Sequence, residues 1–102
     1  MSASRSGELD FLRTLEDIID GRLAKKPAES YVARLAASGE RRVAQKVGEE
    51  AVELALAAAA GDRAEQLDEA ADLLFHLLIL LRTKDLHLAE VATTLERRHH
   101  PP

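Results

Sequence analysis

Apolar residues recur along most of the chain with the spacing of an α-helix. Near the N-terminus they occupy five positions that share one side of a helix: Phe11, Leu12, Leu15, Ile18 and Ile19. Alanine and leucine dominate the composition, whereas aromatic residues make up only 3% and runs of β-branched residues are absent. Because this composition favours helices over strands, we predict an all-α fold.

Local start and stop signals divide the apolar pattern into five helices. The first helix should end at Lys25 to Pro27, where a basic last turn meets a proline. Ser30 should cap a short second helix, which Gly39 ends. A third helix is predicted from about residue 40 to 60, and Gly61-Asp62 separates it from a fourth that reaches about residue 84. Asp85 is expected to cap a short final helix with Leu88, Val91 and Leu95 on one side.

The links between these helices are two to five residues long, so neighbouring helices should pack antiparallel. The 102 residues leave room for one core, and we predict an antiparallel bundle of about five helices. Residues 8–99 would form this domain, and residues 1–7 a disordered N-terminal segment. From Leu73 to Leu81 the fourth helix is apolar on almost every side, so we expect a homodimer to complete the bundle.

Charge and composition exclude several classes of protein. A net charge of −4 argues against nucleic acid or an anionic membrane as a partner, because both bind proteins that carry an excess of basic residues. The chain has no cysteine, which rules out disulfides, thiolate metal sites and a cysteine nucleophile. The N-terminus lacks an apolar signal segment, and the run from Leu73 to Leu81 is too short to span a bilayer. We therefore expect a cytoplasmic protein.

The third helix carries acidic residues on the side that should face the core. Each helical residue turns about 100° around the axis, which places Glu50 inside the apolar stripe that contains Val43 and Val47. Glu53 and Lys46 lie at the edge of this stripe. At least one carboxylate is therefore predicted to point into the bundle.

The fourth helix repeats this arrangement, because Glu69, Asp72 and His76 share one of its faces. Burying an ionised carboxylate alone costs several kcal/mol, so such groups are paired, protonated or bound to a cation. A divalent metal would relieve the repulsion between the two acidic faces, and all-oxygen ligation suits Mg²⁺ or Mn²⁺. The predicted metal ligands are Glu50, Glu53, Glu69 and Asp72.

Each of these residues also has an ordinary structural interpretation. A run of acidic residues is usually a solvated surface, and this applies most directly to Glu49. A lone histidine in an apolar helix, such as His76, is more often a satisfied core residue than a ligand. Lys46 can pair with Glu50 at i,i+4 and is equally well placed to meet a phosphate. The residues alone leave these alternatives open.

The two acidic segments together resemble the paired signature of the all-α nucleotide pyrophosphohydrolases, the MazG-like superfamily. The signature reads Glu49-Glu50-x-x-Glu53, then fifteen residues, then Glu69-x-x-Asp72. The wider sequence is similar to the phosphoribosyl-ATP pyrophosphohydrolase family over about residues 8 to 99. The matching segments are Arg22, Ser30-Tyr31, Gly39, Gln45 to Glu53, Glu69 to His76 and Leu95-x-Arg97-Arg98-His99. Phe75 departs from the family pattern, where tyrosine is as common, so no polar role is expected there.

The resemblance implies a Mg²⁺-dependent enzyme, with Mn²⁺ as a substitute. It would hydrolyse phosphoribosyl-ATP to phosphoribosyl-AMP and pyrophosphate, the second step of histidine biosynthesis. The catalytic residues would be Glu49, which orients or deprotonates the water, and Lys46, which stabilises charge on the phosphates. The substrate-binding residues would be Lys46, His76, Ser30, Tyr31 and Arg22.

The resemblance also implies a homodimer and a pathway neighbour. In many bacteria the domain is fused behind a cyclohydrolase domain, so we expect either a free-standing enzyme or one half of such a fusion. Two other functions share these features. A house-cleaning nucleoside triphosphate pyrophosphohydrolase would use the same metal site, so only substrate-side residues argue against it. A non-catalytic dimeric helical interaction module would leave the acids exposed and gain no stability from Mg²⁺.

Overall fold

The computed structural model describes residues 3–100, with side chains described from residue 7 onward, and it confirms the all-α fold. Within this range the five helices are α1 (Ala3–Lys25), α2 (Tyr31–Ala37), α3 (Glu40–Ala60), α4 (Arg63–Thr83) and α5 (Leu88–His99). α1 already includes residues 3–7, which the sequence analysis placed in a disordered segment, and Met1 and Ser2 lie outside the described residues. Over the described range, no helix combines the length and apolar character needed to cross a membrane.

The start signals predicted for α2 and α4 are confirmed. Ser30 Oγ accepts a hydrogen bond from the backbone N–H of Ala33 at 3.1 Å, and Asp62 Oδ1 accepts one from that of Glu65 at 3.2 Å. Gly61 ends α3 in the left-handed conformation, with φ of 86°, which glycine adopts without steric cost. Local sequence signals therefore set these boundaries.

The prediction that Asp85 caps the last helix is wrong. Asp85 has φ of 60°, so the chain makes a left-handed turn there, and α5 begins only at Leu88. The residue before the helix is His87, whose backbone N–H donates to the Glu90 carboxylate at 3.0 Å. This contact satisfies a backbone donor at the helix start, as in a capping box.

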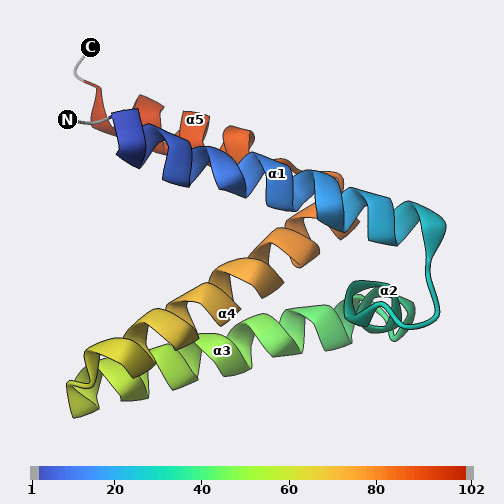
Figure 1. Cartoon of the computed structure of the whole chain (residues 1–102), viewed down its shortest axis with the longest axis horizontal. Helices are drawn as coiled ribbons and strands as arrows, with labels where there is room; N and C mark the ends of the chain where they lie inside the picture. Colours follow the sequence, from blue (N-terminus) through green and yellow to red (C-terminus); the bar gives the residue numbers. More distant parts are fainter. Residues whose placement is uncertain (1–2, 101–102) are drawn as a thin grey trace.

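α3 and α4 form an antiparallel hairpin that is the main helix pair of the molecule (Figure 1). α1 packs across the C-terminal half of α4, and α2 lies between the end of α1 and the start of α3. α5 runs back alongside α1, with a groove of about 690 Å³ between them. Because α1 and the hairpin diverge, the turn between α3 and α4 projects away from the rest of the chain.

The hydrophobic core lies where α1, α2, α3 and α4 meet. Its buried residues come from all four helices and are Ile19, Val32, Leu35, Val43, Leu78 and Ile79. Burying an aliphatic side chain of this size contributes about 1.5–3 kcal/mol. The core therefore fixes one end of the hairpin against α1 and α2, and leaves the projecting end outside it.

The apolar run of α4 is better covered than the sequence analysis assumed. α1, α2 and α3 all pack against α4, and none of residues 73–81 is among the large exposed apolar side chains of the described region. Those side chains lie mainly on α1, on the hairpin and on α5, and include Leu9, Phe11, Ile18, Val52, Leu56, Leu67, Val91 and Leu95. A second chain would therefore have to cover these residues, and not the apolar run of α4.

Candidate functional site

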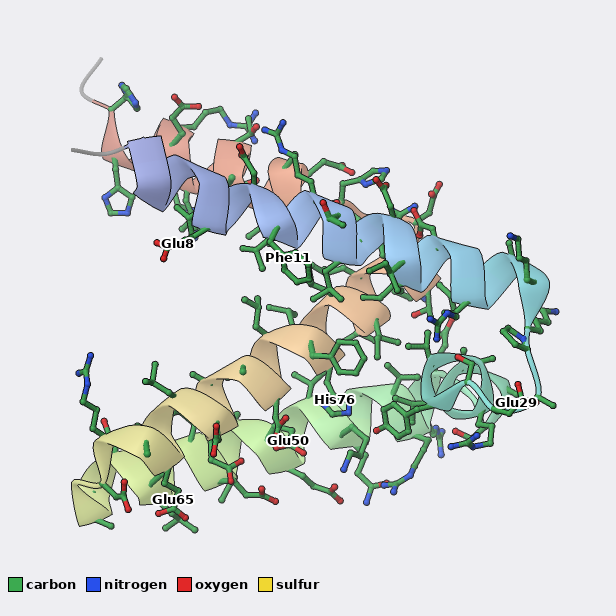
Figure 2. All side chains as sticks on the ribbon, viewed as in Figure 1. Glu8, Phe11, Glu29, Glu50, Glu65 and His76 are labelled. Carbon is green, nitrogen blue, oxygen red and sulfur yellow. The ribbon has the colours of Figure 1, made fainter. Side chains whose placement is uncertain are left out.

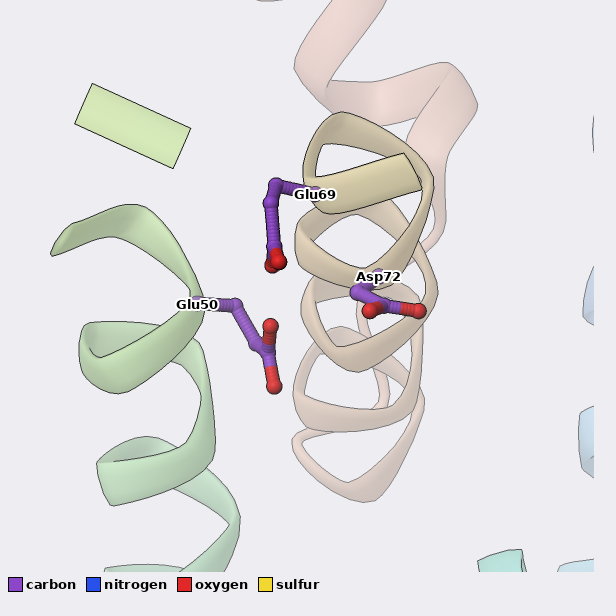
Figure 3. A group of neighbouring side chains, drawn as sticks. All are labelled: Glu50, Glu69 and Asp72. Atoms are coloured by element: carbon purple, nitrogen blue, oxygen red, sulfur yellow. The ribbon is translucent and has the colours of Figure 1, made fainter. Parts of the chain in front are cut away.

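Three acidic side chains meet between α3 and α4. Glu50 from α3 and the pair Glu69 and Asp72 from α4 place carboxylate oxygens within 4.8 Å of one another (Figure 3). Glu50 is buried, Glu69 is half-buried and Asp72 is exposed, so the group runs from the hairpin interior to its surface. The helical spacing thus brings these three residues together, as predicted. We call them the acidic group.

Glu53, the fourth predicted ligand, lies on the exposed side of α3, outside this acidic group. It nevertheless acts on Glu69. Burial, contact with Glu53 and the negative charges of Glu50 and Asp72 together raise the pKa of Glu69 to about 7. The chain therefore concentrates more negative charge here than its own cations balance.

Two oxygens of the acidic group, Glu50 Oε1 and Glu69 Oε1, are buried and have no hydrogen-bond partner within the described part of the chain. Buried polar atoms in folded proteins nearly always have a partner, which can be protein, water or an ion. The donors available here are all carboxylate oxygens, the ligands that Mg²⁺ and Mn²⁺ prefer. The acidic group therefore fits a divalent cation, which would engage both oxygens and offset the repulsion.

A second set of charges extends from Glu50 along α3. Lys46 Nζ lies 3.5 Å from Glu50 Oε2 and 3.7 Å from Glu49 Oε1. The other Glu49 oxygen accepts a hydrogen bond from Gln45 Nε2 at 2.9 Å and lies 3.8 Å from Arg42 Nη1. One hydrogen-bond donor, Gln45, and two cations, Lys46 and Arg42, therefore surround the Glu49 carboxylate. Arg42 was not predicted as a site residue, although its i,i+4 spacing from Lys46 places both on one face of the helix.

His76 is buried, and both of its ring nitrogens have partners inside the chain; Figure 2 places it with Glu50 between α3 and α4. Nδ1 lies 2.8 Å from the backbone carbonyl oxygen of Asp72, and Nε2 lies 2.6 Å from Tyr31 Oη. A carbonyl only accepts, so Nδ1 carries the proton, and in the neutral ring Nε2 accepts from the Tyr31 hydroxyl. Phe75 packs beside both rings without a polar role. His76 thus has the contacts of a satisfied buried histidine, and its contact with substrate stays a prediction.

The two remaining substrate-side predictions fall on different parts of the fold. Ser30 is buried, and its hydroxyl is engaged as the cap of α2. Arg22 is exposed in the last turn of α1, and its side chain forms no hydrogen bond or ion pair with the described residues. No polar contact among those residues joins either side chain to the acidic group.

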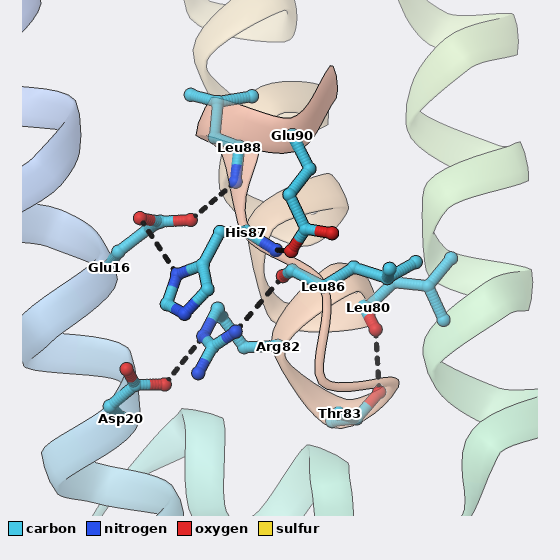
Figure 4. Close-up of polar contacts among 9 residues, drawn as sticks. All are labelled: Glu16, Asp20, Leu80, Arg82, Thr83, Leu86, His87, Leu88 and Glu90. Atoms are coloured by element: carbon cyan, nitrogen blue, oxygen red, sulfur yellow. Dashed lines mark hydrogen bonds and ion pairs between the residues drawn. The ribbon is translucent and has the colours of Figure 1, made fainter. Parts of the chain in front are cut away.

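A polar junction that the sequence analysis missed joins α1 to the turn between α4 and α5 (Figure 4). Glu16 is buried, accepts a hydrogen bond from the backbone N–H of Leu88 at 2.7 Å and lies 3.6 Å from His87 Nδ1. Arg82 Nε donates to Asp20 at 2.8 Å, and this contact raises the pKa of Arg82. The available signal was that Glu16 falls inside the apolar stripe of α1, where an acid needs a partner. The junction anchors α5 at the end of α4 opposite the acidic group.

The chain matches one protein-family model and a large set of known proteins. The family model for phosphoribosyl-ATP pyrophosphohydrolase matches residues 12–99. The chain is 53% identical over 89 residues to the histidine biosynthesis bifunctional protein HisIE of Salmonella typhi, covering 87% of this chain and 44% of that protein. It is 48% identical over 97 residues to the HisIE protein of Yersinia pestis, covering 95% and 48%. The chain thus spans about half the length of the curated relatives it matches. Since the family model covers most of the chain and both acidic segments, the chain belongs to the phosphoribosyl-ATP pyrophosphohydrolase family.

Proposed function

We propose that this chain hydrolyses the α–β phosphoanhydride of phosphoribosyl-ATP to phosphoribosyl-AMP and pyrophosphate, the second step of histidine biosynthesis. Membership of the family over residues 12–99 carries the proposal. The relatives are bifunctional, and the chain matches about half of each, so we assign it only the activity for which its own family is named. A cyclohydrolase, as a fused domain or a separate enzyme, would be its pathway neighbour.

The metal of this reaction would be Mg²⁺, with Mn²⁺ as a substitute, held by Glu50, Glu69 and Asp72. Glu53 would join them from the exposed side of α3, because it already lies close enough to act on Glu69. The two unpartnered oxygens of the acidic group support this assignment. When bound, the ion supplies charge neutralisation for the triphosphate and acidifies a coordinated water.

The side chains around the acidic group have separate roles. Lys46 Nζ lies within 3.7 Å of both Glu49 and Glu50, at the border of the acidic group. Its ammonium would therefore bind the phosphates of a substrate at the acidic group. The Glu49 side chain is 42% exposed and would orient the attacking water and accept its proton. Tyr31 and His76 would border the substrate beside Asp72, because the His76 ring is fixed to the backbone of that residue. Ser30 and Arg22 stay predicted substrate-side residues without a contact to support them.

The proposal is tested by measuring pyrophosphate release from phosphoribosyl-ATP beside a panel of ordinary and modified nucleoside triphosphates. We expect phosphoribosyl-ATP to have the highest kcat/KM, and the release to require Mg²⁺. Higher kcat/KM for a modified nucleotide would indicate a house-cleaning enzyme instead. Lack of hydrolysis of every substrate, together with no effect of Mg²⁺ on stability, would indicate a non-catalytic helical module.

The working unit is proposed to be a homodimer in the cytoplasm. The projecting half of the hairpin exposes Val52 by 59%, Leu56 by 65% and Leu67 by 60%, and a second chain would cover such side chains by a two-fold contact. That contact would also bring basic residues of one chain, such as Arg22 or Arg98, toward the phosphates held by the other. Light scattering at micromolar concentration should report about twice the chain mass of 11.2 kDa. An active monomer would refute the dimer and the shared site.

A further inference from the structure

We propose that Arg42 binds the phosphate chain of the substrate, one helical turn before Lys46, and that it leaves Glu49 to do so. The inference rests on the proposed function, because it names a further contact of the same site. It concerns the face of α3 that carries Arg42, Lys46 and Glu49, whose side chains are 45%, 22% and 42% exposed.

The geometry forms a continuous series of charges that leads to the acidic group. Arg42 Nη1 lies 3.8 Å from Glu49 Oε2, and Lys46 Nζ lies 3.7 Å from Glu49 Oε1, so each oxygen of this carboxylate faces a different cation. Lys46 Nζ then lies 3.5 Å from Glu50 Oε2, inside the site. Arg42 and Lys46 are spaced i,i+4, about one 5.4 Å helical turn apart. A phosphate chain anchored at the acidic group would therefore meet Lys46 first and Arg42 next.

The Arg42 guanidinium still has its hydrogen-bonding capacity available. At 3.8 Å its contact with Glu49 is an ion pair rather than a hydrogen bond, and its side chain makes no hydrogen bond to the described residues. The side chain is 45% exposed. A planar guanidinium matches two phosphate oxygens at once, which a lysine ammonium does not. This position therefore offers an accessible, uncommitted fork for phosphate.

Binding of phosphate would also change the surroundings of Glu49. Exposed ion pairs of this kind are weak, so a phosphate chain with more negative charge would displace Glu49 from Arg42 and Lys46. Gln45 Nε2 would still hold Glu49 Oε2 through the 2.9 Å hydrogen bond. The other oxygen would then be free to accept a hydrogen bond from water. Substrate binding would thus prepare Glu49 for its proposed role.

The chain provides a matched control in Arg41. It has the same charge, is exposed and precedes Arg42 directly, but it points about 100° away around the helix and forms no ion pair among the described residues. Arg41→Gln and Arg42→Gln change the net charge equally. A general electrostatic effect would therefore weaken anion binding to the same degree in both variants.

Titration calorimetry of inorganic pyrophosphate, at constant Mg²⁺ concentration, tests the inference on the full chain. Arg42→Gln should raise the Kd about ten-fold, the loss expected for one charge-assisted phosphate contact, and Arg41→Gln less than about two-fold. Glu49→Gln should lower the Kd, because it removes the competing carboxylate. Equal Kd values for the two arginine variants, or no pyrophosphate binding to the unaltered chain, would overturn the role of Arg42. A raised Kd for Glu49→Gln would overturn the proposal that phosphate displaces Glu49 from Arg42.

This experiment is separable from the proposed function. An unaltered chain that does not hydrolyse phosphoribosyl-ATP, but loses pyrophosphate binding specifically with Arg42→Gln, would refute the proposed function and support the phosphate contact. A chain that hydrolyses phosphoribosyl-ATP, yet binds pyrophosphate equally in both arginine variants, would refute the contact and support the function.

Discussion

Mg²⁺ should stabilise the folded chain, and Glu50→Gln should abolish that effect. The substitution keeps the size of a buried side chain and removes one of the three charges of the acidic group. A ligand that binds only the folded state stabilises it by about 2.7 kcal/mol at 100 times its Kd, and by about 1.4 kcal/mol more for each further ten-fold. In a domain of about 100 residues, 1 kcal/mol shifts the melting temperature by about 4–8 °C. At 100 times the Kd, Mg²⁺ should therefore raise the melting temperature of the unaltered chain by about 10–20 °C.

Thermal unfolding followed by circular dichroism measures this response. The chain is melted in chelator and in a series of Mg²⁺ concentrations, with ionic strength held constant by KCl so that screening is the same throughout. Asp68→Asn is the matched control, because Asp68 is an exposed acid directly before Glu69 that forms no hydrogen bond or ion pair with the described residues. We expect the control to keep the full response and Glu50→Gln to show none.

Two results would refute this reasoning. Equal melting temperatures in Mg²⁺ and in chelator would mean that the acidic group binds no divalent cation in the folded chain. A full Mg²⁺ response in Glu50→Gln would mean that the metal binds without Glu50. The unpartnered Glu50 oxygen would then no longer support its assignment as a metal ligand.

The pKa of Glu69 is raised from an ordinary value of 4.5 to about 7. The protonated side chain therefore contributes its full stabilisation below about pH 4.5, and this stabilisation is lost as the pH rises through about 7. In chelator, the free energy of unfolding should fall between about pH 4.5 and 7, and it should fall less in Glu69→Gln. Glu49→Gln should lower kcat more than it lowers Mg²⁺ affinity, whereas Asp72→Asn should weaken Mg²⁺ binding directly. If calorimetric titration shows that both variants lose the same Mg²⁺ affinity, the separate roles of Glu49 and Asp72 are contradicted. Leu78→Ala should lower the free energy of unfolding in urea by about 2–5 kcal/mol, because the side chain is fully buried. Leu86→Ala is the comparison, because Leu86 is 43% exposed and lies away from the projecting half of the hairpin; it should change the free energy of unfolding by less than about 0.5 kcal/mol, and similar values for both variants would contradict the assigned core.

Most helix boundaries could be predicted because their signals lie within one helical turn. Ser30 and Asp62 each accept a hydrogen bond from a backbone N–H three residues later, and Gly61 takes the left-handed conformation that ends α3. The start of α5 was missed because Asp85 is a good capping residue by type. The backbone turns left-handed at Asp85, and α5 is held instead by Glu16, a residue of α1 far away in the sequence.

The site was predictable to the extent that it follows helical spacing. Counting around α3 and α4 placed Glu50, Glu69 and Asp72 on facing sides, and the structure brings them within 4.8 Å. The same count could not show that Glu53 contacts Glu69 from the exposed side of α3, or that the Tyr31 hydroxyl is hydrogen-bonded to His76. Those details depend on how α2, α3 and α4 pack against one another, which no spacing within a single helix determines.

The sequence by itself determined the helical class, most helix limits and the acidic pattern on two helices, because these depend on residues within about four positions of one another. Only the tertiary structure decided how α4 is covered, that the hairpin projects from the core, and which charges lie along α3. These features arise from contacts between distant segments, such as Ile19 of α1 with the buried residues of α4. Such contacts depend on the shape and packing of whole helices, so the repeating pattern along a single helix does not determine which residues meet.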